Sequence, residues 1–110
     1  MNTLIVGANG GIGRILSKQL VDEEGIMPVA MIRKEDQKSF FGDIGVETVM
    51  GDLESSVEEL SNVFQGADAI VFTAGSGGKT DYDKTLEIDL DAAVKCMEAA
   101  EKNNIKRFII

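Results

Sequence analysis

The sequence predicts an α/β protein built on a doubly wound parallel sheet of five strands in the order 3-2-1-4-5. Three observations lead to this fold class. Short apolar runs alternate along the 110-residue chain with longer segments of helical period. The runs are continuously apolar, as in parallel strands that are buried on both faces. A glycine cluster follows the first run, and right-handed crossover connections then leave few possible strand arrangements.

The elements follow from these patterns in chain order. The apolar runs predict strands at residues 3–6, 27–32, 46–50, 69–73 and 107–110. Helical periodicity predicts helices over residues 12–24, 36–41, 55–64 and 83–103. The first helix is expected to bury a face made of Ile12, Ile15, Leu16, Leu20 and Val21. The last helix is expected to bury Leu86, Leu90, Ala93, Met97 and Ala100.

Composition predicts a single domain over residues 1–110 and argues against several classes of protein. Nineteen acidic and 11 basic residues give a net charge of −8, so we expect no nucleic-acid partner. No apolar run approaches the roughly 20 residues of a membrane span, and the first residues lack the basic segment of a signal peptide. We therefore expect no membrane association.

The usage of histidine and cysteine carries further information. The chain has no histidine and one cysteine, Cys96, which fits a reducing, cytoplasmic location and predicts no metal site. Cys96 is expected to be a small buried helix residue, because no histidine is present to activate it as a nucleophile.

The loop after the first strand carries the strongest functional signal. Gly7, Gly10 and Gly13 are spaced as G-x-x-G-x-x-G. The first glycine permits the tight turn, the second lets backbone N–H groups approach a pyrophosphate, and the third lets the helix pack closely on the sheet. A glycine motif between a strand and an amphipathic helix favours dinucleotide binding over a purely structural turn. The residues expected to contact the dinucleotide here are Gly7, Asn9, Gly10, Gly11, Ile12 and Gly13.

The end of the second strand bears on the choice between NADP and NAD. An acidic residue there would hold the ribose 2′-hydroxyl of NAD, but the chain has Arg33 followed by Lys34. Arginine offers a planar fork to a 2′-phosphate, so we favour NADP as the cofactor. The alternatives are a solvated basic pair, or NAD binding through Glu35 or Asp36.

Two further strand ends add candidate cofactor-binding residues. Asp52 and Leu53 follow the third strand, where Asp52 could accept a hydrogen bond from the adenine amine or cap the next helix. Thr73, Ala74 and Gly75 follow the fourth strand and are expected near the nicotinamide. The next residues, 75–80, resemble the end of a nucleoside-triphosphate P-loop, but Thr73 stands where that motif needs its first glycine, so we do not expect a triphosphatase.

Together these segments resemble the atypical short-chain dehydrogenase/reductases, particularly the small NAD(P)-binding, epimerase-like and NmrA-like members. The resemblance rests on residues 7–14, Arg33, residues 51–53 and residues 73–75, and it extends through residues 89–93, 99–102 and 105–109. Members of this family are longer, so the resemblance implies that the chain is the N-terminal, cofactor-binding half of such a protein, truncated within strand five.

The resemblance implies hydride transfer between NADP(H) and a small substrate that the sequence does not identify. The alternative within this resemblance is a non-catalytic, NADP-binding redox sensor. The family's Tyr-x-x-x-Lys pair has no match, because Tyr82 is the only tyrosine and Leu86 lies four residues on. The catalytic residues therefore stay unknown. An unpaired apolar edge on strand five, at residues 108–110, also leads us to expect either homo-oligomers or low stability of the chain alone.

Overall fold

The computed structural model describes residues 1–8, 10–73 and 82–109, with residues 82–90 described by their backbone alone. Its strands are β1 Asn2–Val6, β2 Met27–Ile32, β3 Glu47–Met50, β4 Ala69–Phe72 and β5 Arg107–Ile109. Its α-helices are α1 Gly11–Val21, α2 Lys38–Asp43, α3 Val57–Val63 and α4 Tyr82–Lys102, and a short 3₁₀ turn, η1 Glu35–Gln37, precedes α2.

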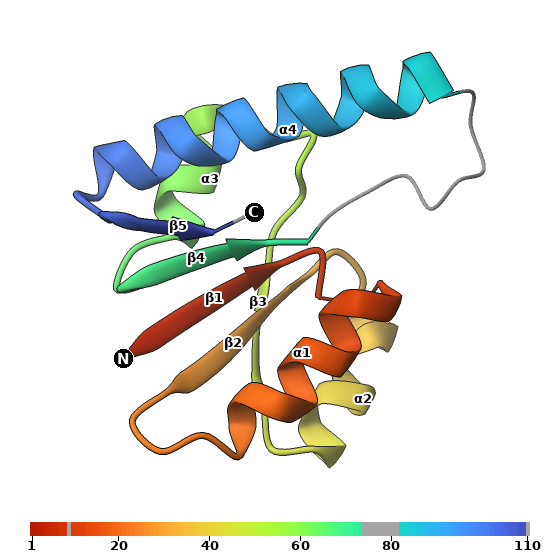
Figure 1. Ribbon diagram of the computed structural model, residues 1–110, viewed down its shortest axis with the longest axis vertical. Coiled ribbons are helices and arrows are strands. Elements are labelled where there is room, and N and C mark those ends of the chain that lie inside the picture. The colour runs from red at the N-terminus through yellow and green to blue at the C-terminus, as the bar shows by residue number, and fades with distance from the viewer. Residues whose placement is uncertain (9, 74–81, 110) are drawn as a thin grey trace.

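The five strands form one parallel sheet in the order β3-β2-β1-β4-β5, which confirms the predicted topology. The chain winds outward from β1 to β3, returns to β4 on the other side of β1, and ends at β5. Helices α1 and α2 cover one face of the sheet, and α3 and α4 cover the other (Figure 1). The winding therefore reverses between β1 and β4, where ligands of doubly wound sheets bind.

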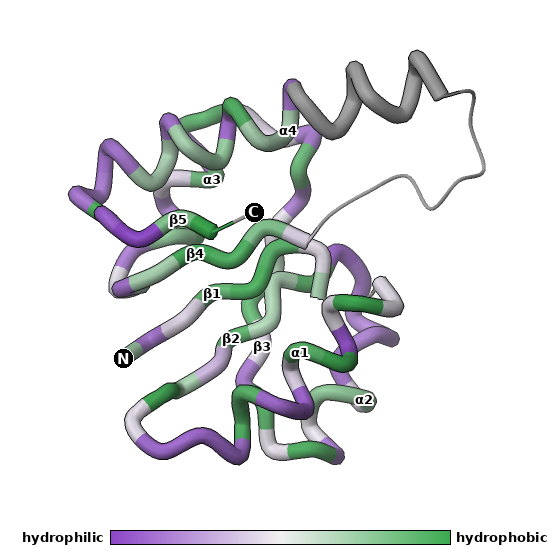
Figure 2. Tube along the Cα trace, in the orientation of Figure 1, coloured by the Kyte–Doolittle hydropathy of each residue, from purple (hydrophilic) through white to green (hydrophobic). Residues whose placement is uncertain are grey.

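Each face of the sheet has its own apolar core, and the strands are the most continuously apolar part of the trace (Figure 2). Alternate residues of β1 serve the two cores, with Leu4 and Val6 facing α3 and α4, and Ile5 facing α1 and α2. Helix α4 contributes mostly small side chains to its core, namely Ala92, Ala93, Cys96, Ala99 and Ala100. The prediction that Cys96 is a buried helix residue is confirmed, since its side chain is fully buried.

Two of the predicted helix faces are partly wrong. On α1, Ile12 and Ile15 are 73% and 60% exposed, while Gly13 and Ser17 are buried against the sheet. On α4, Met97 is 43% exposed, and Cys96 lies inward beside Ala93 and Ala100. The predictions for Leu86 and Leu90 concern side chains outside the described residues.

The Thr3 hydroxyl is the one buried polar side-chain atom without a hydrogen-bond partner within the described parts of the chain. Such a group loses its bonds to water on folding and gains none in return. We expect Thr3→Val to raise the free energy of unfolding by about 1 kcal/mol in urea denaturation. The matched control is Thr73→Val, because Thr73 Oγ1 donates to backbone oxygens of Val6 and Gly7; that variant should be less stable than the parent. A Thr3→Val variant no more stable than the parent would contradict this account.

Two further expectations concern association with a membrane and with other copies of the chain. None of the helices described is long and apolar enough to cross a membrane. Strand β5 pairs with β4, and its Ile109 is 57% exposed. Self-association through this edge stays a prediction.

Candidate functional site

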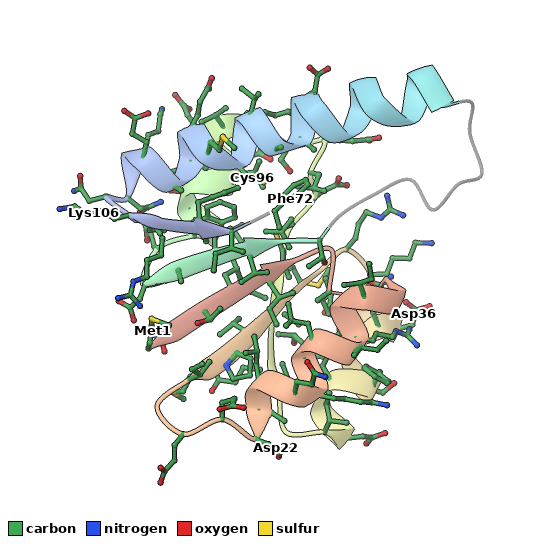
Figure 3. All side chains as sticks on the ribbon, viewed as in Figure 1. Met1, Asp22, Asp36, Phe72, Cys96 and Lys106 are labelled. Carbon is green, nitrogen blue, oxygen red and sulfur yellow. The ribbon has the colours of Figure 1, made fainter. Side chains whose placement is uncertain are left out.

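The candidate residues lie at one edge of the sheet, because all five strands run parallel and end there. In the order of the strands, Asp52 follows β3, Arg33 follows β2, the glycine loop follows β1, and Thr73 follows β4. Asp36 lies at this edge, whereas Met1 and Lys106 lie at the opposite one (Figure 3). The four segments that sequence analysis singled out thus form one row along the carboxyl edge.

The turn after β1 is built on glycine at two positions. Gly7 has a φ of 80°, in the left-handed region that favours glycine, and its carbonyl accepts a hydrogen bond of 3.1 Å from the Gly10 amide. At Gly13, an added Cβ would lie 2.3 Å from the Gly7 oxygen and 2.6 Å from the Ala8 Cα. Helix α1 therefore approaches the loop as closely as its backbone allows, which fixes the direction of the helix.

The N-terminus of α1 presents backbone donors to solvent. The N-cap is Gly10, which has no side chain to cap the helix, and the first turn contains no acidic residue. The first N–H groups of a helix have no partner within it, and they lie at the positive end of the helix dipole. Gly10, Gly11 and Ile12 are exposed, and an added Cβ at Gly11 would meet no described atom within 4 Å. These features fit a pyrophosphate, which needs exposed donors and no competing negative charge.

Thr73 ties the end of β4 to the glycine loop. Its backbone N–H donates to the Val6 oxygen at 2.9 Å, and its hydroxyl lies 2.9 Å from the same oxygen and 3.1 Å from the Gly7 oxygen. The bonds join β1 and β4 at the point where the winding reverses. Thr73 is thus held beside the loop, as the sequence order of the motifs suggested.

Arg33 and Lys34 are exposed at the end of β2, and their backbone is fixed by Gln37. The Gln37 Oε1 accepts from the Arg33 amide at 3.1 Å and from the Lys34 amide at 3.3 Å. Sequence analysis missed this role, although a glutamine at the end of a short helical turn is a known partner for amides just before it. The turn holds the backbone while leaving the Arg33 guanidinium at the surface.

The structure of the loop after β3 shows that one predicted role of Asp52, as the cap of the next helix, is wrong. Its carboxylate Oδ1 accepts from the Glu54 amide at 2.9 Å, which closes a turn within the loop. The cap of α3 is instead Ser56, whose hydroxyl accepts from the Glu59 amide at 3.2 Å. Asp52 therefore does not cap the helix, because the loop takes four more residues before α3 begins at Val57.

Lys95 of α4 also contacts this loop, and no local pattern in the sequence indicates it. The Lys95 Nζ donates to the carbonyl oxygens of Leu53 and Ser55, at 2.9 Å each. These partners lie 42 and 40 residues away along the chain. Only the packing of α4 beside α3 brings them together.

A second group of basic residues lies on α1. The Arg14 guanidinium carbon is 4.5 Å from the centre of the Phe40 ring, and the Lys18 Nζ is 5.5 Å from it. Both distances are within the range of cation–π attraction. The contacts join α1 to α2 on the face of the sheet below the glycine loop.

Some predicted site residues cannot be placed. Asn9, Ala74 and Gly75 lie outside the described residues, as does the P-loop-like segment 75–80. Ile12, by contrast, is described and projects into solvent from the first turn of α1. Over the residues that the structure describes, no cluster of three or more Cys, Asp or Glu side chains could hold a metal ion.

Comparison with known proteins agrees with a dinucleotide-binding domain. Residues 7–110 match the family described as NAD(P)H-binding. The chain is 49% identical to the uncharacterized sugar epimerase YhfK of Bacillus subtilis (strain 168), over 100% of this chain and 51% of that protein. A solved structure of a putative NAD-dependent epimerase/dehydratase from Bacillus halodurans has 44% identity and a TM-score of 0.86, over 98% of this chain and 49% of that one.

A second similar structure contains a cofactor. The triphenylmethane reductase of Citrobacter sp., solved in complex with NADP(H), has 25% identity and a TM-score of 0.75, over 96% of this chain and 35% of that one. The chain spans about half the length of curated relatives that it matches, 51% of one and 49% of another. The matched segment starts at Gly7, the first glycine of the loop that follows β1, and runs from there through β2, β3, β4 and β5 to residue 110. The chain therefore belongs to the NAD(P)H-binding family.

Proposed function

We propose that the chain is the NADP-binding domain of an oxidoreductase that transfers hydride between NADP(H) and a small substrate. The observation that carries the proposal is the first turn of α1, which has no acidic residue and which Gly13 brings against the turn after β1. Amides there would bind the pyrophosphate. When bound, the nicotinamide ring supplies the hydride chemistry, and the protein orients it.

The remaining candidate residues divide between the two ends of the dinucleotide. Arg33 would bind the 2′-phosphate, and Asp52 would accept from the adenine amine, with Leu53 beside it. Thr73 would lie at the nicotinamide end, together with Ala74 and Gly75. The order of β3, β2, β1 and β4 supports this assignment, since it puts Asp52 and Arg33 on one side of the glycine loop and Thr73 on the other.

The preference for NADP is tested by titrating the protein with NADPH and with NADH in a calorimeter at fixed salt. The parent protein should bind NADPH more tightly. Arg33→Ala should weaken NADPH binding by about 10- to 100-fold, the effect of losing a charge-assisted hydrogen bond, and should leave NADH binding unchanged. The matched control is Arg107→Ala, an equal change of charge at the opposite edge of the sheet, where β5 begins.

Other outcomes of the same titration would contradict the role of Arg33 or the proposed function. Tighter binding of NADH would contradict the role of Arg33 and make Glu35 or Asp36 the residue to test. Binding of neither dinucleotide by a folded protein would contradict the proposed function itself. Steady NADPH oxidation with a carbonyl or flavin substrate supports the oxidoreductase, whereas tight binding without turnover supports the redox sensor.

A further inference from the structure

Lys95 connects α4 to the loop that carries Asp52. Its side chain is half-buried, and its Nζ donates to the carbonyls of Leu53 and Ser55 at 2.9 Å each. One ammonium group thus holds two peptide units of the same short loop. A charged donor makes stronger hydrogen bonds than a neutral one.

Within the described residues, the loop makes few other hydrogen bonds to the rest of the fold. At its start, the Gly51 amide donates to the Ile32 oxygen of β2 at 2.9 Å. Within it, the Glu54 and Ser55 amides donate to the side chain and the carbonyl of Asp52, at 2.9 and 3.0 Å. These local bonds set the shape of the turn, and Leu53 packs against the core. Lys95 supplies the polar contacts that fix the turn relative to α4.

We propose that Lys95 is a positioning residue for the adenine end of the cofactor, an inference that rests on the proposed function. Asp52 Oδ1 is already bonded to the Glu54 amide, so the adenine amine would use the other carboxylate oxygen. That bond weakens steeply with misalignment, and Asp52 is immediately followed by Leu53, whose carbonyl Lys95 holds. Loss of the Lys95 contacts lets the carboxylate move away from the amine.

A purely structural role for Lys95 is the competing explanation, and the chain contains a matched contact to test it. Beyond the end of α4, the Asn103 Nδ2 donates to the carbonyl of Ser61 on α3 at 2.7 Å and to its hydroxyl at 3.2 Å. Asn103 therefore also fastens the α4 segment across the chain, but to α3 rather than to the loop. If Lys95 only stabilises the fold, Lys95→Met and Asn103→Ala should have the same kind of effect on cofactor binding.

The test compares NADPH with its hypoxanthine analogue, in which a carbonyl replaces the adenine amine. The dissociation constant of each is measured by calorimetry for the parent, Lys95→Met, Lys95→Gln, Lys95→Arg and Asn103→Ala. The parent should prefer NADPH by about tenfold, the effect of one hydrogen bond. Lys95→Met and Lys95→Gln should bring the ratio close to one, Lys95→Arg should retain most of it, and Asn103→Ala should leave it unchanged.

The outcomes separate this inference from the proposed function. A parent protein that binds NADPH but does not prefer it over the analogue would overturn the role of Lys95 and leave the proposed function standing. A preference for NADPH that survives in Lys95→Met would also overturn the role of Lys95. If the methionine variant does not fold, survival of the preference in Lys95→Gln would overturn it in the same way. Loss of the preference in Asn103→Ala as well would assign Lys95 a general structural role. Failure of the folded parent to bind either dinucleotide would overturn both.

Discussion

Replacing Gly13 with alanine should destabilise the protein by about 3 kcal/mol or more, the upper range for overpacking against atoms that cannot rotate away. The new Cβ would lie 2.3 Å from the Gly7 oxygen, 2.6 Å from the Ala8 Cα and 2.7 Å from the Ala8 oxygen. All three are backbone atoms of the turn after β1, so relief requires α1 or the turn to move. The free energy of unfolding in urea measures the effect.

The matched control is Gly11→Ala, two residues earlier in the same helix. Its Cβ would meet nothing within 4 Å, and alanine favours helix over glycine by up to about 1 kcal/mol. We therefore expect Gly11→Ala to be as stable as the parent or more so. Equal stability of the two variants would show that the contact at Gly13 does not limit the approach of α1.

Raising the pH above 9 should cost the protein stability through Cys96. Burial raises the pKa of this thiol from 9.0 to about 12, and the nearby Lys95 charge only partly offsets the shift. Below pH 9 the thiol is protonated in both the folded and the unfolded protein, so its contribution is constant. Between pH 9 and 12 the unfolded chain releases the proton and the folded chain keeps it. The free energy of unfolding therefore falls as the pH rises.

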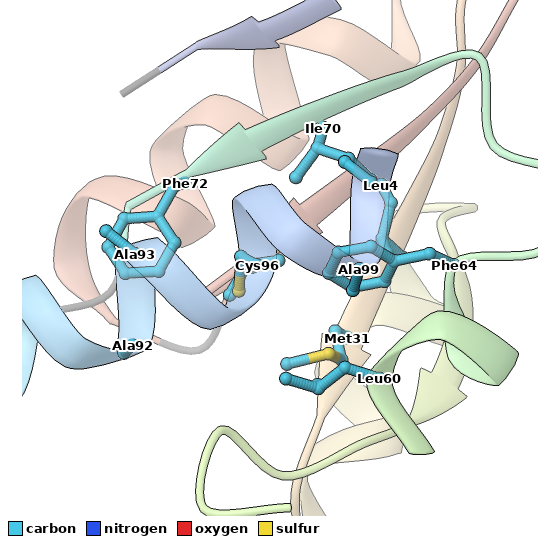
Figure 4. Close-up of a cluster of buried hydrophobic side chains, with 12 residues drawn as sticks. Leu4, Met31, Leu60, Phe64, Ile70, Phe72, Ala92, Ala93, Cys96 and Ala99 are labelled. Carbon is cyan, nitrogen blue, oxygen red and sulfur yellow. The ribbon is translucent and has the colours of Figure 1, made fainter. Parts of the chain in front are cut away.

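Urea unfolding near pH 8 and near pH 10.5 measures this loss, with Cys96→Ala as the reference. The alanine variant loses a sulfur that lies between α4 and the sheet (Figure 4), so it should be less stable than the parent near pH 8. Near pH 10.5 the parent should have lost about 2 kcal/mol relative to the variant. Other titrating groups are common to both proteins and cancel in the comparison. Parallel pH profiles for the two proteins would contradict the burial of a protonated thiol.

Local patterns in the sequence predicted the elements well where one chemical feature dominates. The apolar runs placed all five strands to within two residues. The inner strands β1, β2 and β4 are largely buried, whereas the edge strands β3 and β5 are half-buried or exposed. Gly66, which comes soon after α3, has a φ of 84°, a conformation that glycine adopts without strain. The 3₁₀ turn at Glu35–Gln37 was missed, and the predicted helix over 36–41 became α2 at Lys38–Asp43.

Contacts between distant segments could not be predicted in the same way. Nothing near Asp52 in the sequence indicates Lys95, which lies on another element. The capping alternative for Asp52 was wrong because the loop closes on Glu54 first and Ser56 then caps α3. Where the loop turns decides which of the two residues, Asp52 or Ser56, caps α3.

The sequence by itself determined the order of the strands and the location of the candidate site. Apolar runs that alternate with helical segments along the chain indicate a parallel sheet. A glycine loop after the first strand marks the edge of that sheet where a dinucleotide binds. Tertiary structure decided which side of each helix is buried. The close approach at Gly13 turns α1 so that Gly13 and Ser17 face the sheet, which leaves Ile12 and Ile15 exposed. On α4, close packing favours the alanines and Cys96 over Met97, because small side chains let the helix lie nearer the strands.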